Sequence, residues 1–330
     1  MKAPIILICM SMVCNFPSIA QLFDRSEPLA HTYSIVARDP ATGDMAVAVQ
    51  SHWFSVGSIV SWGEAGVGVV ATQSFVNPSY GTKGLSMLKE GKSPQEVLDQ
   101  LLDEDTGREV RQVAILDVKG RLATHTGNKC IQYAGHQQGE NFSVQANMML
   151  NPTVWPEMAK AFEQSAALPL PERMIAVLKA AESQGGDIRG RQSAVLLVVK
   201  GIATVKPWED RVVDLRVDDH ENPVLELERL LKVFRAYEHM NNGDLAVETG
   251  DMALASQEYG AAEAMFPDNM EMRYWHAITL ANNKNVDKAI EMLKPIFKAN
   301  RHWLLLTQRL PEVGLLEISE VDLQRILGSK

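Results

Sequence analysis

Side chains that could do chemistry are most densely placed in GGDIRGRQSA, residues 185–194. This segment lies between an expected helix end and an apolar strand, and loops at strand ends are where folds often place binding groups. Arg191 could bind a carboxylate through two hydrogen bonds, with Asp187 holding its guanidinium and with Gln192 and Ser193 adding polar contacts. The same residues could instead form a network of caps and ion pairs that only closes the helix. The sequence leaves both interpretations open.

A second polar cluster, TQSFVNPSYG, follows another apolar run and contains Gln73, Asn77 and Tyr80. The Asn77–Pro78 pair favours a turn, so these side chains either line a pocket or satisfy the backbone of a loop. Isolated polar residues near the ends of other expected strands are weaker candidates for substrate binding: His52, Thr126 and Asn147.

The familiar motifs of other chemistries are missing from the sequence. It contains no GxSxG, no GxxxxGK[ST] and no HExxH. His125, Cys130 and His136 lie near one another, but no second pair completes a metal-ligand spacing. We therefore expect no metal and no cofactor. The formal net charge of −9, without a block of lysine or arginine, argues against a nucleic-acid partner.

The elements that must position these residues follow from the hydrophobic pattern. Strands are expected at 32–39, 44–51, 65–73, 111–117, 121–127, 129–133, 142–147, 193–200 and 210–218, and helices at 81–91, 93–105, 152–166 and 169–184. This order of strands, two helices, strands, two helices and strands lacks the strict alternation of a parallel doubly wound sheet. It predicts an α+β fold in which two antiparallel sheets lie between two pairs of helices.

The N-terminal residues have the pattern of a signal peptide over 1–20. Lys2 supplies a positive charge, residues 5–13 are apolar, and small residues precede a cleavage point after Ala20. We expect a periplasmic or secreted product that begins with a polar leader, residues 21–31. Such cleavage would leave Cys130 as the single cysteine, so the mature chain could form no internal disulfide.

The composition changes at a charged, proline-ended linker, Asp218–Pro223. It separates a domain over 32–217 from a helical domain over 218–330. Residues 251–267 and 285–301 resemble each other at an offset of 34 residues, which is the tetratricopeptide period. An ordinary helical bundle is an equal alternative.

Residues 32–200 resemble the domain of unknown function 1028 family, an uncharacterised bacterial group placed among the N-terminal nucleophile (Ntn) hydrolases. The likeness is carried by TYSIVARDPATGDMAVAVQSHWFSVGSIVSWGEAGVGVVATQSFVNPSYG, RQVAILDVKGRLATHTG and GGDIRGRQSA. Residues 215–316 resemble a peptidoglycan-binding domain that often follows this family, through DLRVDDHENPVLELERLL and RLPEVGLL. The resemblance implies a four-layer αββα Ntn-hydrolase-like sandwich followed by an all-α helical domain.

The resemblance also implies a mechanism. In Ntn hydrolases the nucleophile is the first residue of the mature chain, at the start of the first strand, and its own α-amine is the base. Thr32 takes that position here, while Asp187 and Ser193 stand roughly where proteasome-type sites place an Asp and a Ser. Two features depart from the pattern: the leader precedes Thr32, and the first lysine after Thr32 is Lys83, far from the usual position.

Two functions follow from these observations. The first is an exported Ntn amidohydrolase that cleaves an amide bond in peptidoglycan fragments or amino-acid conjugates, with Asn77 or Asn147 stabilising the oxyanion. The second is a non-catalytic cell-envelope protein that uses an Ntn-like pocket and a helical module docking on the wall or on a protein. The expected partners are an amide or peptide-like substrate and peptidoglycan; assembly as a homo-oligomer is left open.

Overall fold

The computed structural model describes residues 29–329, which divide after Val224 into two compact units. The expected signal peptide and all but the last three residues of the leader lie outside the described residues. None of the helices within residues 29–329 combines the length and the apolar character that a membrane span requires.

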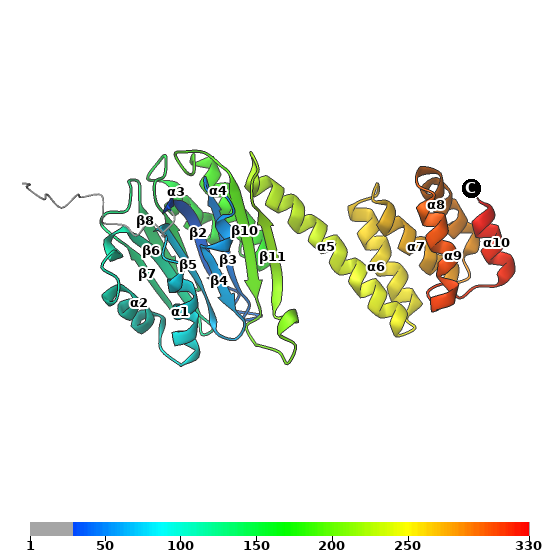
Figure 1. Ribbon diagram of the computed structural model, residues 1–330, viewed down its shortest axis with the longest axis horizontal. Helices are drawn as coiled ribbons and strands as arrows, with labels where there is room; N and C mark the ends of the chain where they lie inside the picture. Colours follow the sequence, from blue (N-terminus) through cyan, green and yellow to red (C-terminus); the bar gives the residue numbers. More distant parts are fainter. Residues whose placement is uncertain (1–28, 330) are drawn as a thin grey trace, which may run out of the picture. The chain divides into compact units, whose positions relative to one another are not determined.

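The first unit is built on two antiparallel sheets (Figure 1). The five-stranded sheet has the order β1-β5-β6-β7, with β4 also paired to β5; its strands are β1 (Leu29–Ala30), β4 (Ser61–Glu64), β5 (Gly68–Phe75), β6 (Arg111–Asp117) and β7 (Leu122–Thr126). The six-stranded sheet has the order β11-β10-β3-β2-β9-β8; its strands are β2 (Thr32–Arg38), β3 (Met45–Ser51), β8 (Gly135–Gly139), β9 (Phe142–Ala146), β10 (Ser193–Val199) and β11 (Arg211–Val217).

Helices pack on both sheets, and the sheets also contact each other. The five-stranded sheet contacts α1 (Ser79–Lys89) and α2 (Pro94–Asp103), whereas the six-stranded sheet contacts α3 (Val154–Gln164) and α4 (Leu170–Ser183). Helix α2 begins with the capping box that the sequence indicates, in which Ser93 and Glu96 satisfy each other's backbone N–H groups. The expected α+β architecture with antiparallel sheets and a helical C-terminal region is confirmed.

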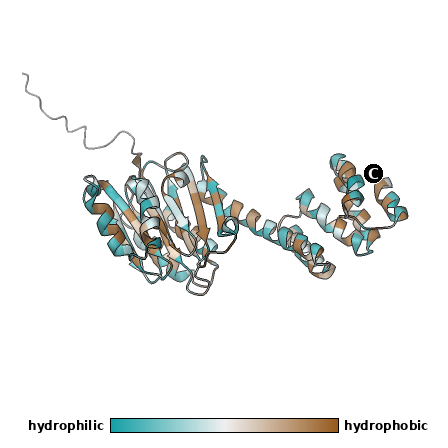
Figure 2. Ribbon diagram, turned by 60° about the horizontal axis from the view of Figure 1, so that its bottom comes forward, coloured by the Kyte–Doolittle hydropathy of each residue, from teal (hydrophilic) through white to brown (hydrophobic). Residues whose placement is uncertain are grey.

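The apolar patterns of the strands follow from this packing. Strands β2, β3 and β10 are buried along almost their whole length, because one face meets the other sheet and the opposite face meets α4. The edge strands β8 and β11 have exposed positions. Hydrophobic segments accordingly run along the strands of this unit (Figure 2). The core between the sheets contains Val36, Val47, Val49, Ala71, Ala114, Val195 and Leu197.

Three short segments differ from the sequence-based expectation. The prediction of a strand at 129–133 is wrong: these residues form no strand and lie mostly in bends, and the strand lies at Gly135–Gly139. The apolar Ile131 and Tyr133 suggest a buried strand but are partly exposed, whereas β8 is a polar edge strand with no apolar pattern to reveal it. Strands β1 and β4 were not expected, because two- and four-residue strands carry too little periodicity.

The second unit is helical. Helix α5 (Pro223–Glu248) begins at the boundary and is followed by α6 (Met252–Met265), α7 (Met270–Asn282), α8 (Val286–Ala299), α9 (His302–Arg309) and α10 (Glu320–Gly328). The 34-residue offset aligns Ala255 with Ala289 and Tyr259 with Leu293. All four side chains are buried in α6 and α8. The sequence repeat therefore marks core positions of two helices.

Candidate functional site

Three hydroxyl residues lie in one row at the end of the six-stranded sheet. Thr32 of β2 is opposite Ser51 of β3, and Ser51 is in turn opposite Ser193 of β10. Residues directly opposite each other in an antiparallel pair place their side chains on the same face. All three are completely buried. The hydroxyl of Thr32 donates to the backbone oxygen of Ala30 at 2.8 Å.

The peptide bond before Thr32 has an unusually well-bound carbonyl. Its oxygen, which belongs to His31, accepts hydrogen bonds from Ser51 Oγ at 2.6 Å and from Arg189 Nη2 at 2.8 Å. We call His31 O with these two donors the carbonyl clamp. One donor is a hydroxyl and the other is a permanently charged guanidinium, so the clamp places positive potential on this oxygen.

Asp187 holds Arg189 in the clamp. The Asp187 side chain is completely buried, and its carboxylate accepts hydrogen bonds from Arg189 Nε at 3.0 Å and from Arg189 Nη2 at 2.7 Å. Asp187 also accepts from the backbone N–H of His52 at 3.2 Å. Gly185, with a φ of 95°, follows the end of α4, a position that favours glycine. This turn carries the chain from α4 to Asp187.

A group of buried amides lies on the other side of Thr32. Gln73 and Asn147 each donate to Gln112 Oε1, at 2.7 and 2.9 Å, and each donates to the backbone oxygen of Thr32, at 3.2 and 3.3 Å. We call these three side chains the amide network. Gln112 also donates to Thr126 Oγ1 at 2.9 Å, which brings Thr126 to the edge of the group. The network joins the two sheets.

The side chain of His31 closes this arrangement. Its Nδ1 lies 2.8 Å from Asn147 Oδ1, and because an amide oxygen only accepts, Nδ1 carries the proton. The ring also packs edge-on against Phe75. Burial lowers the pKa of His31 below its usual 6.5, although the hydrogen bond to Asn147 acts in the opposite direction. His31 is therefore neutral at neutral pH.

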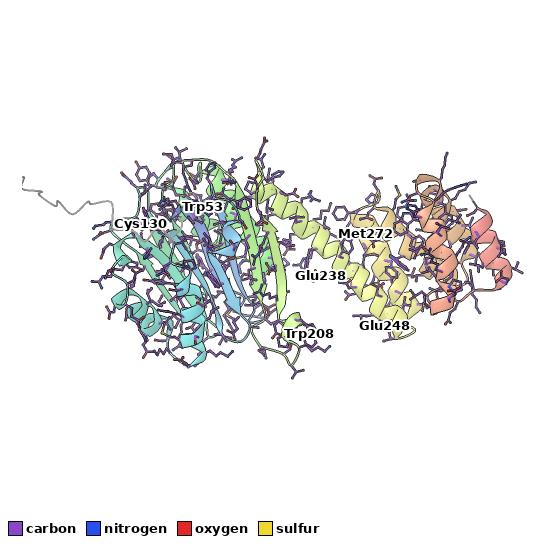
Figure 3. All side chains as sticks on the ribbon, in the orientation of Figure 1. Trp53, Cys130, Trp208, Glu238, Glu248 and Met272 are labelled. Carbon is purple, nitrogen blue, oxygen red and sulfur yellow. The ribbon has the colours of Figure 1, made fainter. Side chains whose placement is uncertain are left out.

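Of the residues expected from the sequence, the structure brings together Thr32, Gln73, Asn147, Thr126 and Asp187. Ser193 shares the hydroxyl row, but its Oγ donates to the backbone oxygen of Trp53 at 2.5 Å and accepts from the N–H of Val56 at 3.1 Å. It thereby fixes the segment that leaves β3, where Trp53 lies (Figure 3).

Five other expected residues, including His52, have partners other than Thr32. Tyr80 donates to Asp105 at 2.8 Å, where Arg111 also binds, and Asn77 accepts from the backbone N–H of Ser79 at the start of α1. The prediction that Asp187 holds Arg191 is wrong, because Asp187 binds Arg189. The remaining pairs are Arg191 with Glu182 and Gln192 with Asp219.

His52 is exposed. Its ring lies 3.3 Å from the backbone oxygen of Arg191, and only its backbone N–H reaches Asp187.

Sequence reasoning assigned no role in the site to His31, Ser51, Gln112 or Arg189. Arg189 had a local signal, since it stands two residues after Asp187 in the polar segment already singled out. Gln112 interrupts an apolar strand, which indicates a buried polar group but not its partners. No three His, Cys, Asp or Glu side chains within residues 29–329 are grouped to hold a metal ion.

Comparisons with known proteins give four findings. A family model described as "Family of unknown function (DUF1028)" matches residues 32–227, more than half of the chain. A crystal structure of a DUF1028 protein from Silicibacter pomeroyi is 31% identical, with a TM-score of 0.55, over 62% of this chain and 88% of that one. No curated protein is significantly similar to the chain.

The fourth finding is a weaker structural similarity. Anbu (ancestral beta-subunit) from Yersinia bercovieri is 12% identical, with a TM-score of 0.31, over 62% of this chain and 96% of that one. A similarity at this level supports no inference about the site.

Proposed function

The chain belongs to the DUF1028 family, whose function is unknown, and we propose that it is the precursor of an Ntn-type amidohydrolase. Thr32 becomes the nucleophile when the peptide bond between His31 and Thr32 is cut. The layering of two helix pairs on two facing sheets supports an Ntn-hydrolase-like αββα sandwich for this unit.

The observation that carries the proposal is the carbonyl clamp. When the Thr32 hydroxyl adds to the carbonyl carbon of His31, the negative charge develops on the oxygen that Ser51 and Arg189 already contact at 2.6 and 2.8 Å. Donors placed in advance on a developing oxyanion typically contribute 10²–10³-fold in rate each, about 2.7–4 kcal/mol. A structural role alone would not require a charged donor on this particular carbonyl.

The cleavage balances without an external reagent other than water. Thr32 Oγ1 bonds to the carbonyl carbon of His31, the bond from that carbon to the Thr32 nitrogen breaks, and the hydroxyl proton passes to the departing nitrogen. Water then hydrolyses the ester, which leaves a carboxylate on His31 and restores the hydroxyl. Thr32 now has a free α-amine, a group whose unperturbed pKa is near 8, and this amine can serve as its base.

Cleavage also explains how a buried residue would become accessible. Ala30 and His31 are almost fully buried, and β1 is paired with β5 through Phe75 and Ser74. Once these residues leave, Thr32 loses the groups that cover it, and Ser51 and Arg189 lose their acceptor. The carbonyl oxygen of a substrate amide takes that place, so the same donors serve cleavage and turnover. Asp187 positions Arg189 in both steps.

The proposed substrate is an amide or peptide-like compound outside the cytoplasm. The pattern of a signal peptide over residues 1–20 motivates the location, and the likeness of the C-terminal region to a peptidoglycan-binding domain motivates wall fragments as substrates. A second candidate is the non-catalytic envelope protein. It is favoured by the hydrogen bond of Thr32 Oγ1, which goes to a backbone oxygen and not to a base.

The intact mass of the full-length protein tests the proposal. We expect a species that begins at Thr32, its absence in Thr32→Ala, and its return in Thr32→Ser, which keeps a hydroxyl. A chain that begins at Thr32, released from a fusion by an added protease, separates cleavage from turnover. A threonine-reactive β-lactone should label its N-terminus. The amidohydrolase proposal fails if the wild-type chain stays intact and if the chain that begins at Thr32 neither reacts with the β-lactone nor hydrolyses amides. The non-catalytic binding protein then remains as the candidate function.

A further inference from the structure

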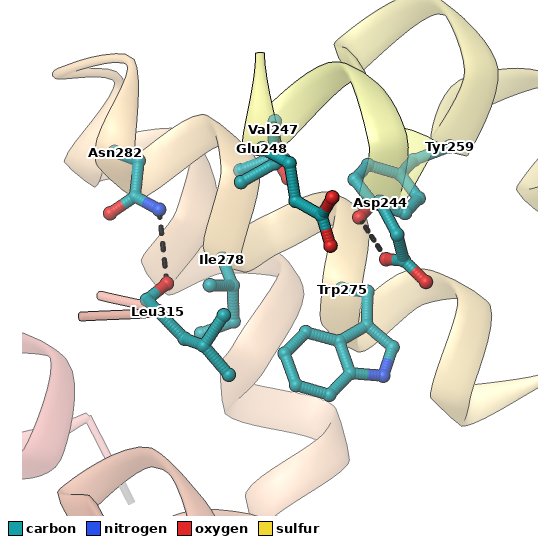
Figure 4. Close-up of a pocket in the computed structure, with 9 residues that line it drawn as sticks. Asp244, Val247, Glu248, Tyr259, Trp275, Ile278, Asn282 and Leu315 are labelled. Carbon is teal, nitrogen blue, oxygen red and sulfur yellow. Dashed lines mark hydrogen bonds between the residues drawn. The ribbon is translucent and has the colours of Figure 1, made fainter. Parts of the chain in front are cut away.

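The second unit contains an open pocket of about 360 Å³. It lies among α5, α6, α7 and the segment before α10 (Figure 4). The residues that line it are Asp244, Val247, Glu248, Tyr259, Trp275, Ile278, Thr279, Asn282 and Leu315. None of these is basic, so the pocket carries only negative charge.

The apolar part of the pocket is a partly buried tryptophan with aliphatic neighbours. Trp275 packs against Tyr274 with 5.2 Å between the ring centroids, and Ile278 lies one turn of helix further along α7. Leu315, which is 45% exposed, forms another wall, and Asn282 binds its backbone oxygen at 3.1 Å. An exposed leucine beside a tryptophan offers contact area to an aliphatic chain.

The polar part consists of two carboxylates one helical turn apart on α5. Tyr259 donates to Asp244 Oδ1 at 2.5 Å and so fixes this carboxylate in the wall. The side chain of Glu248 makes no hydrogen bond or ion pair within the described part of the chain. Its carboxylate points toward Trp275 (Figure 4), and the residue lies in the last turn of α5 (Figure 3). The pocket therefore joins an aromatic ring to a carboxylate without a partner.

We propose that this pocket binds the side chain of a lysine or arginine from an extended peptide. The aliphatic stem packs on Ile278 and Leu315, and the cation lies between Glu248, Asp244 and the ring of Trp275. A cation over an indole contributes about 0.5–1 kcal/mol at an exposed site, and the carboxylates add charge attraction. This inference is independent of the function proposed for Thr32.

The charge of the pocket selects against other occupants. An amino acid whose amine stands beside a carboxylate, such as the free end of diaminopimelate in wall peptides, would place a negative charge near Asp244 and Glu248. A sugar would leave both carboxylates without a counter-charge, and an acidic peptide would be repelled. An isolated cation at the end of an aliphatic chain satisfies both halves of the pocket.

Blocked pentapeptides test the proposal on the full-length protein. They differ only in the central residue, which is lysine, arginine, norleucine or glutamate. The readout is the NMR signal of the Trp275 indole N–H, assigned from Trp275→Phe. We expect the lysine and arginine peptides to shift this signal, norleucine to bind at least about fivefold more weakly, as expected for the loss of about 1 kcal/mol, and glutamate to leave it unchanged. The binding should weaken as salt is raised.

Glu248→Gln is the decisive variant, because this exposed side chain has no structural partner to lose. It should weaken binding of the lysine peptide about three- to fivefold. The matched control is Glu291→Gln, which removes an exposed charge from α8 away from the pocket. The proposal is overturned by equal binding of lysine and norleucine, by wild-type affinity in Glu248→Gln, by tighter binding of a diaminopimelate wall peptide, or by no shift at millimolar peptide.

Discussion

The surroundings of Thr32 and the pocket of the helical unit differ in the burial of their polar side chains and in whether these side chains have partners. Around Thr32 the amide network and the hydroxyls of Thr32, Ser51 and Ser193 are completely buried, and each of these side chains has a hydrogen-bond partner. Asp187 is also buried and pairs with Arg189, whose side chain is 27% exposed. In the helical unit Glu248 is exposed and has no partner within residues 29–329. Buried polar groups with partners give a rigid arrangement that only a covalent change would open, whereas a carboxylate without a partner can bind at once. Under the two proposals, the site around Thr32 is latent, because it opens only after cleavage, whereas the pocket is ready to bind without a covalent change.

The largest effect expected is on cleavage, through the charged donor of the carbonyl clamp. Arg189→Met removes one of the two donors to His31 O and should slow cleavage at Thr32 by about 10²–10³-fold. Arg189→Lys keeps the charge without the paired hydrogen bonds to Asp187, so an intermediate rate is expected. Mass spectrometry of samples taken after synthesis gives the rates.

Arg191→Met is the matched control for this experiment. Arg191 stands two residues away and binds Glu182, so cleavage should stay near the wild-type rate. Melting temperatures show whether either variant acts through stability. If Arg191→Met and Arg189→Met slow cleavage equally at equal stability, the carbonyl clamp is not the reason the bond breaks, and the site around Thr32 is no longer latent in the sense proposed.

The second largest effect is expected on stability, through the hydrogen bonds of the amide network. Gln112→Leu deprives Gln73, Asn147 and Thr126 of a shared partner and should destabilise the first unit by about 2–3 kcal/mol. Gln50 offers a comparison within the same unit. Its side chain is equally buried, but neither its nitrogen nor its oxygen has a hydrogen-bond partner among residues 29–329.

Gln50→Leu should therefore be neutral or stabilising, because it removes a desolvated amide without breaking a hydrogen bond. Urea denaturation of both variants, in the uncleaved Thr32→Ala chain, measures the difference. Similar losses in the two variants would mean that burial alone, and not the satisfied network, distinguishes the surroundings of Thr32 from the open pocket.

The sequence predicted the framework because hydrophobic periodicity is a local property. The hairpin that carries Thr32 follows from TYSIVARD and DMAVAVQS, and β10 follows from SAVLLVV. The strands β1, β4 and β8 were not predicted from the sequence. Strand β1 pairs with a strand distant in the sequence, since Ala30 lies opposite Ser74. Strand β8 pairs with its neighbour β9, but its residues are polar and carry no apolar pattern.

The candidate site was predictable only in part, for the same reason. Thr32 and Asp187 stand out through their position at strand and helix ends. The carbonyl clamp joins residues 31, 51 and 189, and nothing local in any of them indicates the other two. The choice of Arg189 over Arg191 as the partner of Asp187 depends on which way each side chain leaves one loop, which composition does not encode.

A smaller effect is expected from the buried His31. Its folded pKa lies below 6.5 because of burial, so the unfolded chain binds more protons once the pH falls below about 6.5. Stability should therefore be present above this pH and decline as the pH falls, by at most about 1.4 kcal/mol per pH unit. His31→Gln, which keeps a donor for Asn147, should decline less.

The measurement is urea denaturation against pH in the uncleaved Thr32→Ala chain. The pKa of His136 is also lowered, chiefly by burial. The variant His136→Gln is therefore measured in parallel, and it gives the contribution of His136 to the pH dependence of stability. A chain that begins at Thr32 lacks His31 and should lose this part of the pH dependence. If the chain that begins at Thr32 keeps this pH dependence of stability, the pH dependence does not come from His31.

The smallest effect expected has the opposite sign and belongs to the open pocket. Asp244 and Glu248 are like charges four residues apart on α5, and Glu248 also stands at the negative end of the helix dipole. Glu248→Gln should therefore raise the stability of the second unit by a few tenths of a kcal/mol at low salt, and less at high salt. Thermal unfolding checks this, with Glu291→Gln measured alongside. Glu291 has Lys288 and Lys294 three residues away, so its substitution should lower the stability a little.

A residue that costs stability while it strengthens ligand binding is retained for binding. If Glu248→Gln instead destabilises the second unit, the side chain of Glu248 has a structural partner in solution. The pocket would then not offer a carboxylate without a partner, and its contrast with the surroundings of Thr32 would be wrong.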